Sequence, residues 1–465
     1  MADNTPQWSG SSAFLHGFAR GDIEGPPSGN PSTWWGSAKL ALPEGVTQTV
    51  VRLQAEDGAH SRGILYRKGG EGTVLVFAHP RGDFSSHYLT PVLLDAGVAV
   101  FGGQVRSFAN DSDCIHESLL ADIAAEIRYL RSLGFEKVVL VGNSGGGSLF
   151  SFYQAQAGTE PPGRLTDTPA GDPYDLNALD LPQADALVLL AAHLGEGRYA
   201  LDSLDPSMVD ESDPLSCDPS LDMYSPDNGY REPPEPSRYT AEFLARYREA
   251  QRARCERLDA VARDDIRRRR EAREAMSAPG FADLPLRTRL ATIRRAEVSR
   301  YLTVARMDAN PAFTDMTIHP SPRAVGSLFG GRDPHAYNYR LGGPASVVTP
   351  EAWLSTWSGL SSRASVPANI PHVHVPLLVV NYTRDLVIFP DQIQEIVDRA
   401  GTTDISVVEI ESDHYGVPAS GTAEDVIKQV GDAISSWLAA HQRPCLSQGE
   451  KERSECESDL SGPAT

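Results

Sequence analysis

Short apolar runs alternate with amphipathic segments over two stretches of the chain. The runs typical of strands are 47–55, 62–67, 73–78, 98–101, 137–141, 186–191, 375–381 and 405–410. Apolar residues at helical spacing occupy 117–132, and further helices are expected near 390–400 and 422–440. This pattern predicts an α/β fold, in which helices cover both faces of a mostly parallel sheet.

The alternation stops near residue 194 and resumes near 374. The intervening segment is acidic and proline-rich at first, and it then contains a long helix candidate over about 239–276, with i,i+4 ion pairs. We therefore treat it as a mainly helical insertion within the core. The expected divisions are an N-terminal arm at 1–45, the first part of the core at 46–193, the insertion at 194–373, the second part of the core at 374–442 and a disordered tail at 443–465.

Composition narrows the classes of function. The 465 residues carry a formal net charge of −20, which disfavours binding to nucleic acids and to anionic membranes. The N-terminus lacks the basic and apolar regions of a signal peptide, and the five cysteines show no metal-ligand spacing. We expect a cytoplasmic protein that uses no metal and no organic cofactor.

A G-x-S-x-G pattern follows the strand-like run at 137–141. It reads Gly142-Asn143-Ser144-Gly145-Gly146, and a helix-like run comes directly after it. Small neighbours are needed where a serine occupies a sharp turn from strand to helix, and that turn exposes the hydroxyl at a helix N-terminus. The pattern predicts that Ser144 is a nucleophile.

A serine nucleophile needs a histidine base and a carboxylate that orients the histidine. Asp385 comes shortly after the strand predicted at 375–381, and His414 follows the strand predicted at 405–410. Both lie where the chain order Ser, acid, His requires them. Asp413 is the alternative acid, but adjacent loop residues rarely meet in the required geometry, so Asp385 is preferred.

The oxyanion of the reaction needs two N–H donors. The residue after the nucleophile, Gly145, is one candidate. The second is expected in the loop His79-Pro80-Arg81-Gly82 after the strand at 73–78, and Arg81 is the choice because proline has no N–H. His79 is expected to hold this loop by a hydrogen bond.

Four segments together resemble the α/β-hydrolase family: GNSGG at 142–146, HPRG at 79–82, RDLVIFP at 384–390 and SDHYG at 412–416. The resemblance covers nearly all of 47–192 and 374–440. It implies that the insertion at 194–373 is a cap over the active site, placed between the sixth and seventh core strands. Many members carry a glycine where this chain has Pro80. This departure bears on the geometry of the oxyanion site and not on the fold.

Other residues are candidates for binding the substrate. They are His193 at the end of a core strand, Trp353 and Trp357 late in the insertion, and Tyr415 beside the expected base. Ordinary packing within the insertion is an equal alternative for the two tryptophans. Arg267–Arg270 has two interpretations, a docking site for an anionic group or the solvated face of a salt-bridged helix, and the second is favoured.

The sequence thus predicts a serine hydrolase that cleaves a small to medium carboxylic ester or lactone through an acyl-enzyme. A thioesterase, a carbon–carbon bond hydrolase and an oligopeptidase remain alternatives on the same triad. A non-catalytic binding protein on the same fold is an alternative of another class. The expected partner is a small-molecule substrate, and homo-oligomers through the N-terminal arm or the insertion stay open.

Overall fold

A computed structural model describes residues 41–108, 110–326, 333–340 and 344–441. The predicted tail at 443–465 lies outside these residues, as does the predicted N-terminal arm apart from 41–45.

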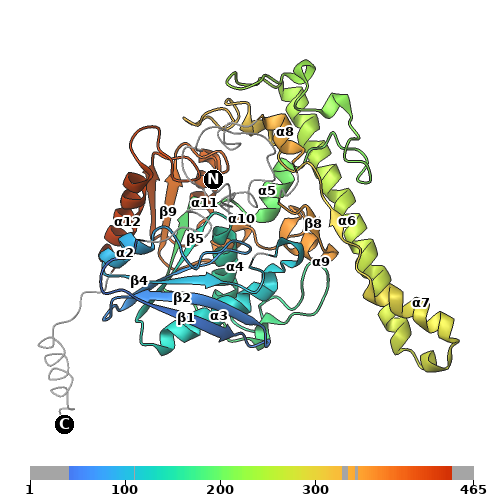
Figure 1. The fold of residues 1–465 in the computed structure, drawn as a ribbon, viewed down its shortest axis with the longest axis horizontal. Coiled ribbons are helices and arrows are strands. Elements are labelled where there is room, and N and C mark those ends of the chain that lie inside the picture. The colour runs from blue at the N-terminus through green and yellow to red at the C-terminus, as the bar shows by residue number, and fades with distance from the viewer. Residues whose placement is uncertain (1–40, 109, 327–332, 341–343, 442–465) are drawn as a thin grey trace, which may run out of the picture.

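An eight-stranded sheet forms the centre of the protein (Figure 1). Its strands are β1 (Thr47–Gln54), β2 (His60–Arg67), β3 (Thr73–Phe77), β4 (Ala99–Gln104), β5 (Lys137–Asn143), β6 (Ala186–Leu190), β9 (Leu377–Tyr382) and β10 (Ile405–Ile410). Their spatial order is β1-β2-β4-β3-β5-β6-β9-β10. β2 pairs antiparallel with β1 and with β4, and the other pairs are parallel.

The central strands β3, β5, β6 and β9 are apolar on both faces because each face is covered by helices. Along β3, Val74 and Val76 pack with α3 and α4, whereas Leu75 and Phe77 pack with α2 and α12. The bounds are α2 (Thr90–Asp95), α3 (His116–Ser132), α4 (Gly146–Gly158), α11 (Pro390–Arg399) and α12 (Ala423–Ala440). Strand order and layers are those of an α/β-hydrolase fold, so the predicted fold class is confirmed.

The chain between β6 and β9 forms helices and a two-stranded sheet of β7 (Leu302–Thr303) and β8 (Val347–Val348). The longer helices are α5 (Glu196–Ser203), α6 (Ala241–Ser277) and α7 (Leu286–Glu297), and the short ones include α8 (Pro334–Asn338), α9 (Pro350–Ala352) and α10 (Val366–Asn369). α6 agrees with the long helix predicted at 239–276. Figure 1 shows α6 and α7 as a hairpin that extends from the body of the protein.

The four consecutive arginines of α6 all have carboxylate partners. Arg267 and Arg268 pair with Asp264, and Arg267 also pairs with Glu271. The remaining pairs are Arg269 with Asp265 and Glu351, and Arg270 with Asp172. The run is therefore a salt-bridged helix face, which agrees with the favoured interpretation of 267–270.

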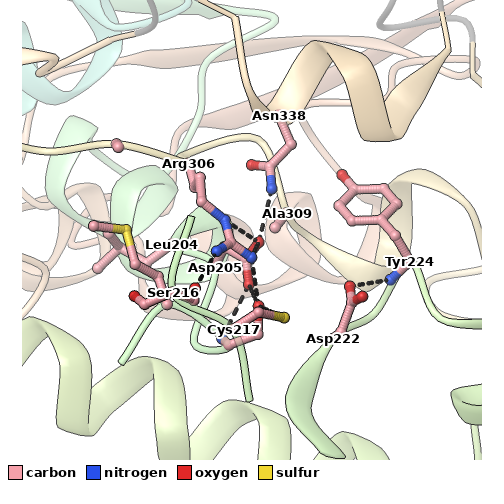
Figure 2. A network of polar contacts seen from close by, with 12 residues as sticks. Leu204, Asp205, Ser216, Cys217, Asp222, Tyr224, Arg306, Ala309 and Asn338 are labelled. Carbon is pink, nitrogen blue, oxygen red and sulfur yellow. Dashed lines mark hydrogen bonds and ion pairs between the residues drawn. The ribbon is translucent and has the colours of Figure 1, made fainter. Parts of the chain in front are cut away.

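A buried ion pair joins distant parts of the insertion (Figure 2). Arg306 Nη2 lies 2.7 Å from Asp205 Oδ2, and neither side chain is more than 1% exposed. Arg306 also donates to the Ser216 carbonyl at 2.8 Å, and Asn338 Nδ2 donates to Asp205 at 2.7 Å. Removing one member of such a pair leaves a buried charge without a partner, so the network fixes how these segments pack.

The insertion contacts the core at the first turn of α3. Ser355, in the helical segment η9 (Trp353–Trp357), donates its hydroxyl to Glu117 Oε2 at 2.6 Å and accepts the His116 N–H at 2.9 Å. Burial raises the pKa of Glu117 from 4.5 to about 7, and the Ser355 hydrogen bond opposes this only in part.

Glu117→Gln is expected to change how stability depends on pH. Between about pH 4.5 and 7 the folded protein holds the Glu117 proton while the unfolded chain has lost it, so native stability falls as pH rises. Glutamine removes this loss, which reaches about 3 kcal/mol above pH 7. Urea unfolding of the wild type and of Glu117→Gln at pH 5 and pH 8 measures this difference in stability, and Glu256→Gln, at an exposed glutamate, is the control. A midpoint difference from the wild type that is the same at both pH values would contradict the prediction.

Candidate active site

Ser144 lies at a sharp turn between β5 and α4, with a positive φ of 54°. Its N–H donates to the Leu190 carbonyl of β6 at 3.1 Å. A Cβ at Gly142 would lie 2.6 Å from Gly147 Cα, and one at Gly146 would lie 2.5 Å from the Ala78 carbonyl oxygen. The turn therefore needs glycine on both sides of Ser144, and a strained serine of this kind is a mark of functional sites.

Ser144, His414 and Asp385 come together from three separate loops. His414 Nε2 lies 3.2 Å from Ser144 Oγ, and His414 Nδ1 lies 2.7 Å from Asp385 Oδ2. All three side chains are buried, and Asp385 is 1% exposed. The distances suit proton transfer from the hydroxyl to the imidazole, with the carboxylate on the opposite ring nitrogen.

The second oxygen of Asp385 fixes the carboxylate. Its Oδ1 accepts the N–H groups of Val387 at 2.6 Å and Ile388 at 3.0 Å. Asp413 has a different environment, because its Oδ1 accepts the N–H groups of Tyr415 and Val417, both at 2.9 Å. Asp413 thus shapes the loop that carries His414, while Asp385 contacts the imidazole ring.

The loop after β3 differs from expectation in one hydrogen bond. The Arg81 N–H donates to His79 Nδ1 at 3.2 Å, and the Gly82 N–H donates to the same atom at 2.9 Å. Burial lowers the pKa of His79 to about 3, which keeps this nitrogen an acceptor. His79 thus holds the loop as expected. The Arg81 N–H, however, already donates to His79 Nδ1 and is not available to an oxyanion in this structure. Gly145 is the N-cap of α4, so its N–H belongs to the group that helices leave without an intrahelical acceptor.

The four residues suggested for substrate binding fall into different environments. The Tyr415 ring packs edge-on against His414, with centroids 5.4 Å apart. Trp357 lies under the Arg81 guanidinium at 5.4 Å, and His193 lines a small cavity with Tyr199. Trp353 and Trp357 both pack in the apolar core of the insertion, and Trp353 also donates its Nε1–H to Asp259 of α6, so packing accounts for the place of Trp353.

The residue that the sequence did not point to is Glu196, at the start of α5. It is 2% exposed, with Oε2 3.3 Å from His193 Nε2 and Oε1 3.6 Å from Arg81 Nε. Burial alone would raise its pKa, but His193 and Arg81 hold the pKa of this carboxyl below its usual range. The sequence did contain one indication of its place: Glu196 comes shortly after β6, at the same edge of the sheet as the Ser144 turn.

Within the described ranges, no three His, Cys, Asp or Glu side chains are grouped to hold a metal ion. None of the described helices has the length and apolar character needed to cross a membrane.

No protein-family model and no curated protein matches the chain. Among solved structures, DcsB in complex with its substrate analogue is 15% identical, over 85% of this chain and 99% of DcsB, with a TM-score of 0.43. The α/β hydrolase GrgF from Penicillium sp. sh18 is 10% identical, over 84% of this chain and 99% of its own, with a TM-score of 0.43. Brefeldin A esterase, a bacterial homologue of human hormone sensitive lipase, is 14% identical, over 87% of this chain and 81% of its own, with a TM-score of 0.40. Likenesses this low say nothing about the reaction.

Proposed function

We propose that this chain is a serine hydrolase that cleaves a small to medium carboxylic ester or lactone through an acyl-enzyme. The observation that carries the proposal is the continuous contact from Ser144 Oγ through the His414 ring to Asp385. A binding protein has no need for all three groups at these distances.

In the proposed reaction, Ser144 Oγ attacks the acyl carbonyl while His414 Nε2 takes its proton. Asp385 Oδ2 holds the proton on His414 Nδ1, which leaves Nε2 free to accept, and it stabilises the imidazolium that forms. The same Nε2–H then protonates the leaving alcohol. A water molecule, activated by His414, attacks the acyl-enzyme and releases the acid.

The proposed oxyanion site begins with the Gly145 N–H. A second donor is the Arg81 N–H, once a substrate oxygen replaces His79 Nδ1 as its acceptor, a 3.2 Å contact. Removing one such donor typically costs about a hundredfold or more in kcat.

We assign the insertion the role of a cap. It places Glu196 against Gly145, one residue after Ser144, and Trp357 beside Arg81, and it thereby borders the proposed site. A bounded site favours small substrates over polymers. His193 and Tyr415 are the core residues that would contact a bound acyl group.

Three substrates that share one acyl group but differ in the leaving group test which type of bond is cleaved. Hydrolysis of p-nitrophenyl butyrate, a butyryl thioester and butyryl p-nitroanilide by the native protein is measured as kcat/KM. We expect the ester to be the best substrate and the anilide to be at least about a hundredfold poorer, because an amine leaves less readily than a phenolate. A preference for the anilide would indicate a peptidase, and a protein that hydrolyses none of the three is not the proposed enzyme.

A further inference from the structure

A second buried carboxylate borders the proposed nucleophile. Glu196 belongs to the insertion, yet a Cβ on Gly145 would lie 2.4 Å from its Oε1 and 2.8 Å from His79 Nε2. Any residue other than glycine at 145 would place its Cβ in this space. Here glycine leaves the space to Glu196, so its Oε1 lies against the backbone one residue after Ser144.

The two oxygens of Glu196 have different surroundings. His193 Nδ1 accepts the Gly195 N–H at 3.1 Å, so the ring proton is on Nε2, which lies 3.3 Å from Glu196 Oε2. Oε1 has no hydrogen-bond donor among the described residues, and the Arg81 Nε at 3.6 Å is beyond that distance. A buried carboxylate oxygen without a donor is costly, and such oxygens are rare in native proteins.

The position of Oε1 suits a group on the acyl side of a substrate. Oε1 would lie 2.4 Å from a Cβ on Gly145, and consecutive Cα atoms are about 3.8 Å apart, so this oxygen lies close to the backbone of the nucleophile turn. A donor it could accept from would therefore belong to a part of the acyl group near its carbonyl.

The charge of the site indicates which donor fits. Glu196 already has the Arg81 guanidinium as an ionic partner, so a second cation would leave an excess of positive charge beside it. A neutral hydroxyl supplies the missing hydrogen bond without adding charge.

We propose that Glu196 Oε1 binds a hydroxyl group on the α or β carbon of the substrate's acyl part, which makes hydroxyacyl esters or lactones the preferred substrate class. This inference rests on the proposed hydrolase function. A site built to bond a hydroxyl discriminates strongly against the analogue that lacks it, because the buried acceptor is then left unpaired.

The test compares kcat/KM for the p-nitrophenyl esters of α-hydroxybutyrate, β-hydroxybutyrate and butyrate. The native protein is expected to prefer one of the two hydroxy esters over butyrate by about a hundredfold or more. Glu196→Ala is expected to bring this ratio to within about threefold. Glu196→Gln keeps the shape and one acceptor oxygen, and it is expected to lower the ratio at least about tenfold because a charged acceptor is replaced by a neutral one. Glu395→Gln, on the outer helix α11, is the matched control and should keep the native ratio.

The outcomes separate the two proposals. If butyrate is hydrolysed but neither hydroxy ester is preferred, or if the preference persists in Glu196→Gln, the role of Glu196 is overturned while the hydrolase stands. If the native protein hydrolyses no ester and Ser144 is not labelled by a fluorophosphonate, the proposed function fails and this inference fails with it. If Glu196→Ala does not fold, the ratio of kcat/KM for the hydroxy ester to that for butyrate in Glu196→Gln decides whether Glu196 has the proposed role.

Discussion

Replacing Ser144 by alanine is expected to lower kcat for ester hydrolysis by about four to six orders of magnitude. The variant keeps the imidazole and its carboxylate but has no atom that can form the acyl-enzyme, so only slow attack by water remains. Alanine also fits the space, because the serine hydroxyl contacts only His414 Nε2 among the hydrogen bonds described for it. The measurement is steady-state hydrolysis of p-nitrophenyl butyrate.

Ser151→Ala is the matched control for this experiment. Ser151 is a buried serine on the same helix, α4, and its hydroxyl donates to the Ser148 carbonyl at 3.2 Å, within that helix. We expect its kcat to stay within about twofold of the wild type, since one neutral hydrogen bond within a helix contributes little to the site. If Ser144→Ala keeps more than about a hundredth of the native rate, the nucleophile is elsewhere.

Asp385→Asn is expected to lower kcat by about ten-thousandfold at neutral pH. Asp385 Oδ1 accepts two backbone N–H groups, so an asparagine keeps its carbonyl oxygen there and turns its amide N–H toward His414 Nδ1. The ring must then accept at Nδ1 and carry its proton on Nε2, where it cannot take the proton of Ser144. The kcat measurement is paired with a thermal melt, which should show that the variant is folded.

Asp413→Asn separates the two carboxylates near the base. Its Oδ1 accepts backbone N–H groups only, and an asparagine oxygen preserves both bonds. We expect a loss of less than about tenfold in kcat. A larger loss from Asp413→Asn than from Asp385→Asn would move the catalytic acid to position 413.

The parts of the site that the sequence predicted are those set by local geometry. The turn at Ser144 needs glycine at 142 and 146 for close approach to neighbouring backbone, and this need is visible as a motif. Asp385 and His414 each follow an apolar run, and parallel strands bring the loops at their carboxyl ends to one edge of the sheet. These contacts follow from chain order and strand direction.

The parts that could not be predicted depend on packing between distant segments. Trp353 and Trp357 pack in the same apolar core of the insertion, where Trp353 also contacts Asp259 of α6 and Trp357 lies under Arg81. No residue pattern states that the His79 ring turns back to accept the Arg81 N–H, because that orientation depends on the burial of the ring. Glu196 reaches Gly145 only because α5 begins beside the turn, which is a property of the folded insertion.

Whether Ser144 is an activated nucleophile can be tested by mapping the site of a fluorophosphonate adduct by peptide mass spectrometry. We expect an adduct on Ser144 of the native protein, none on Ser151, and none on Ser144 after heat denaturation, because activation requires the folded contacts with His414 and Asp385. An adduct on a different residue, or equal labelling of the native protein and Ser144→Ala, would contradict this expectation.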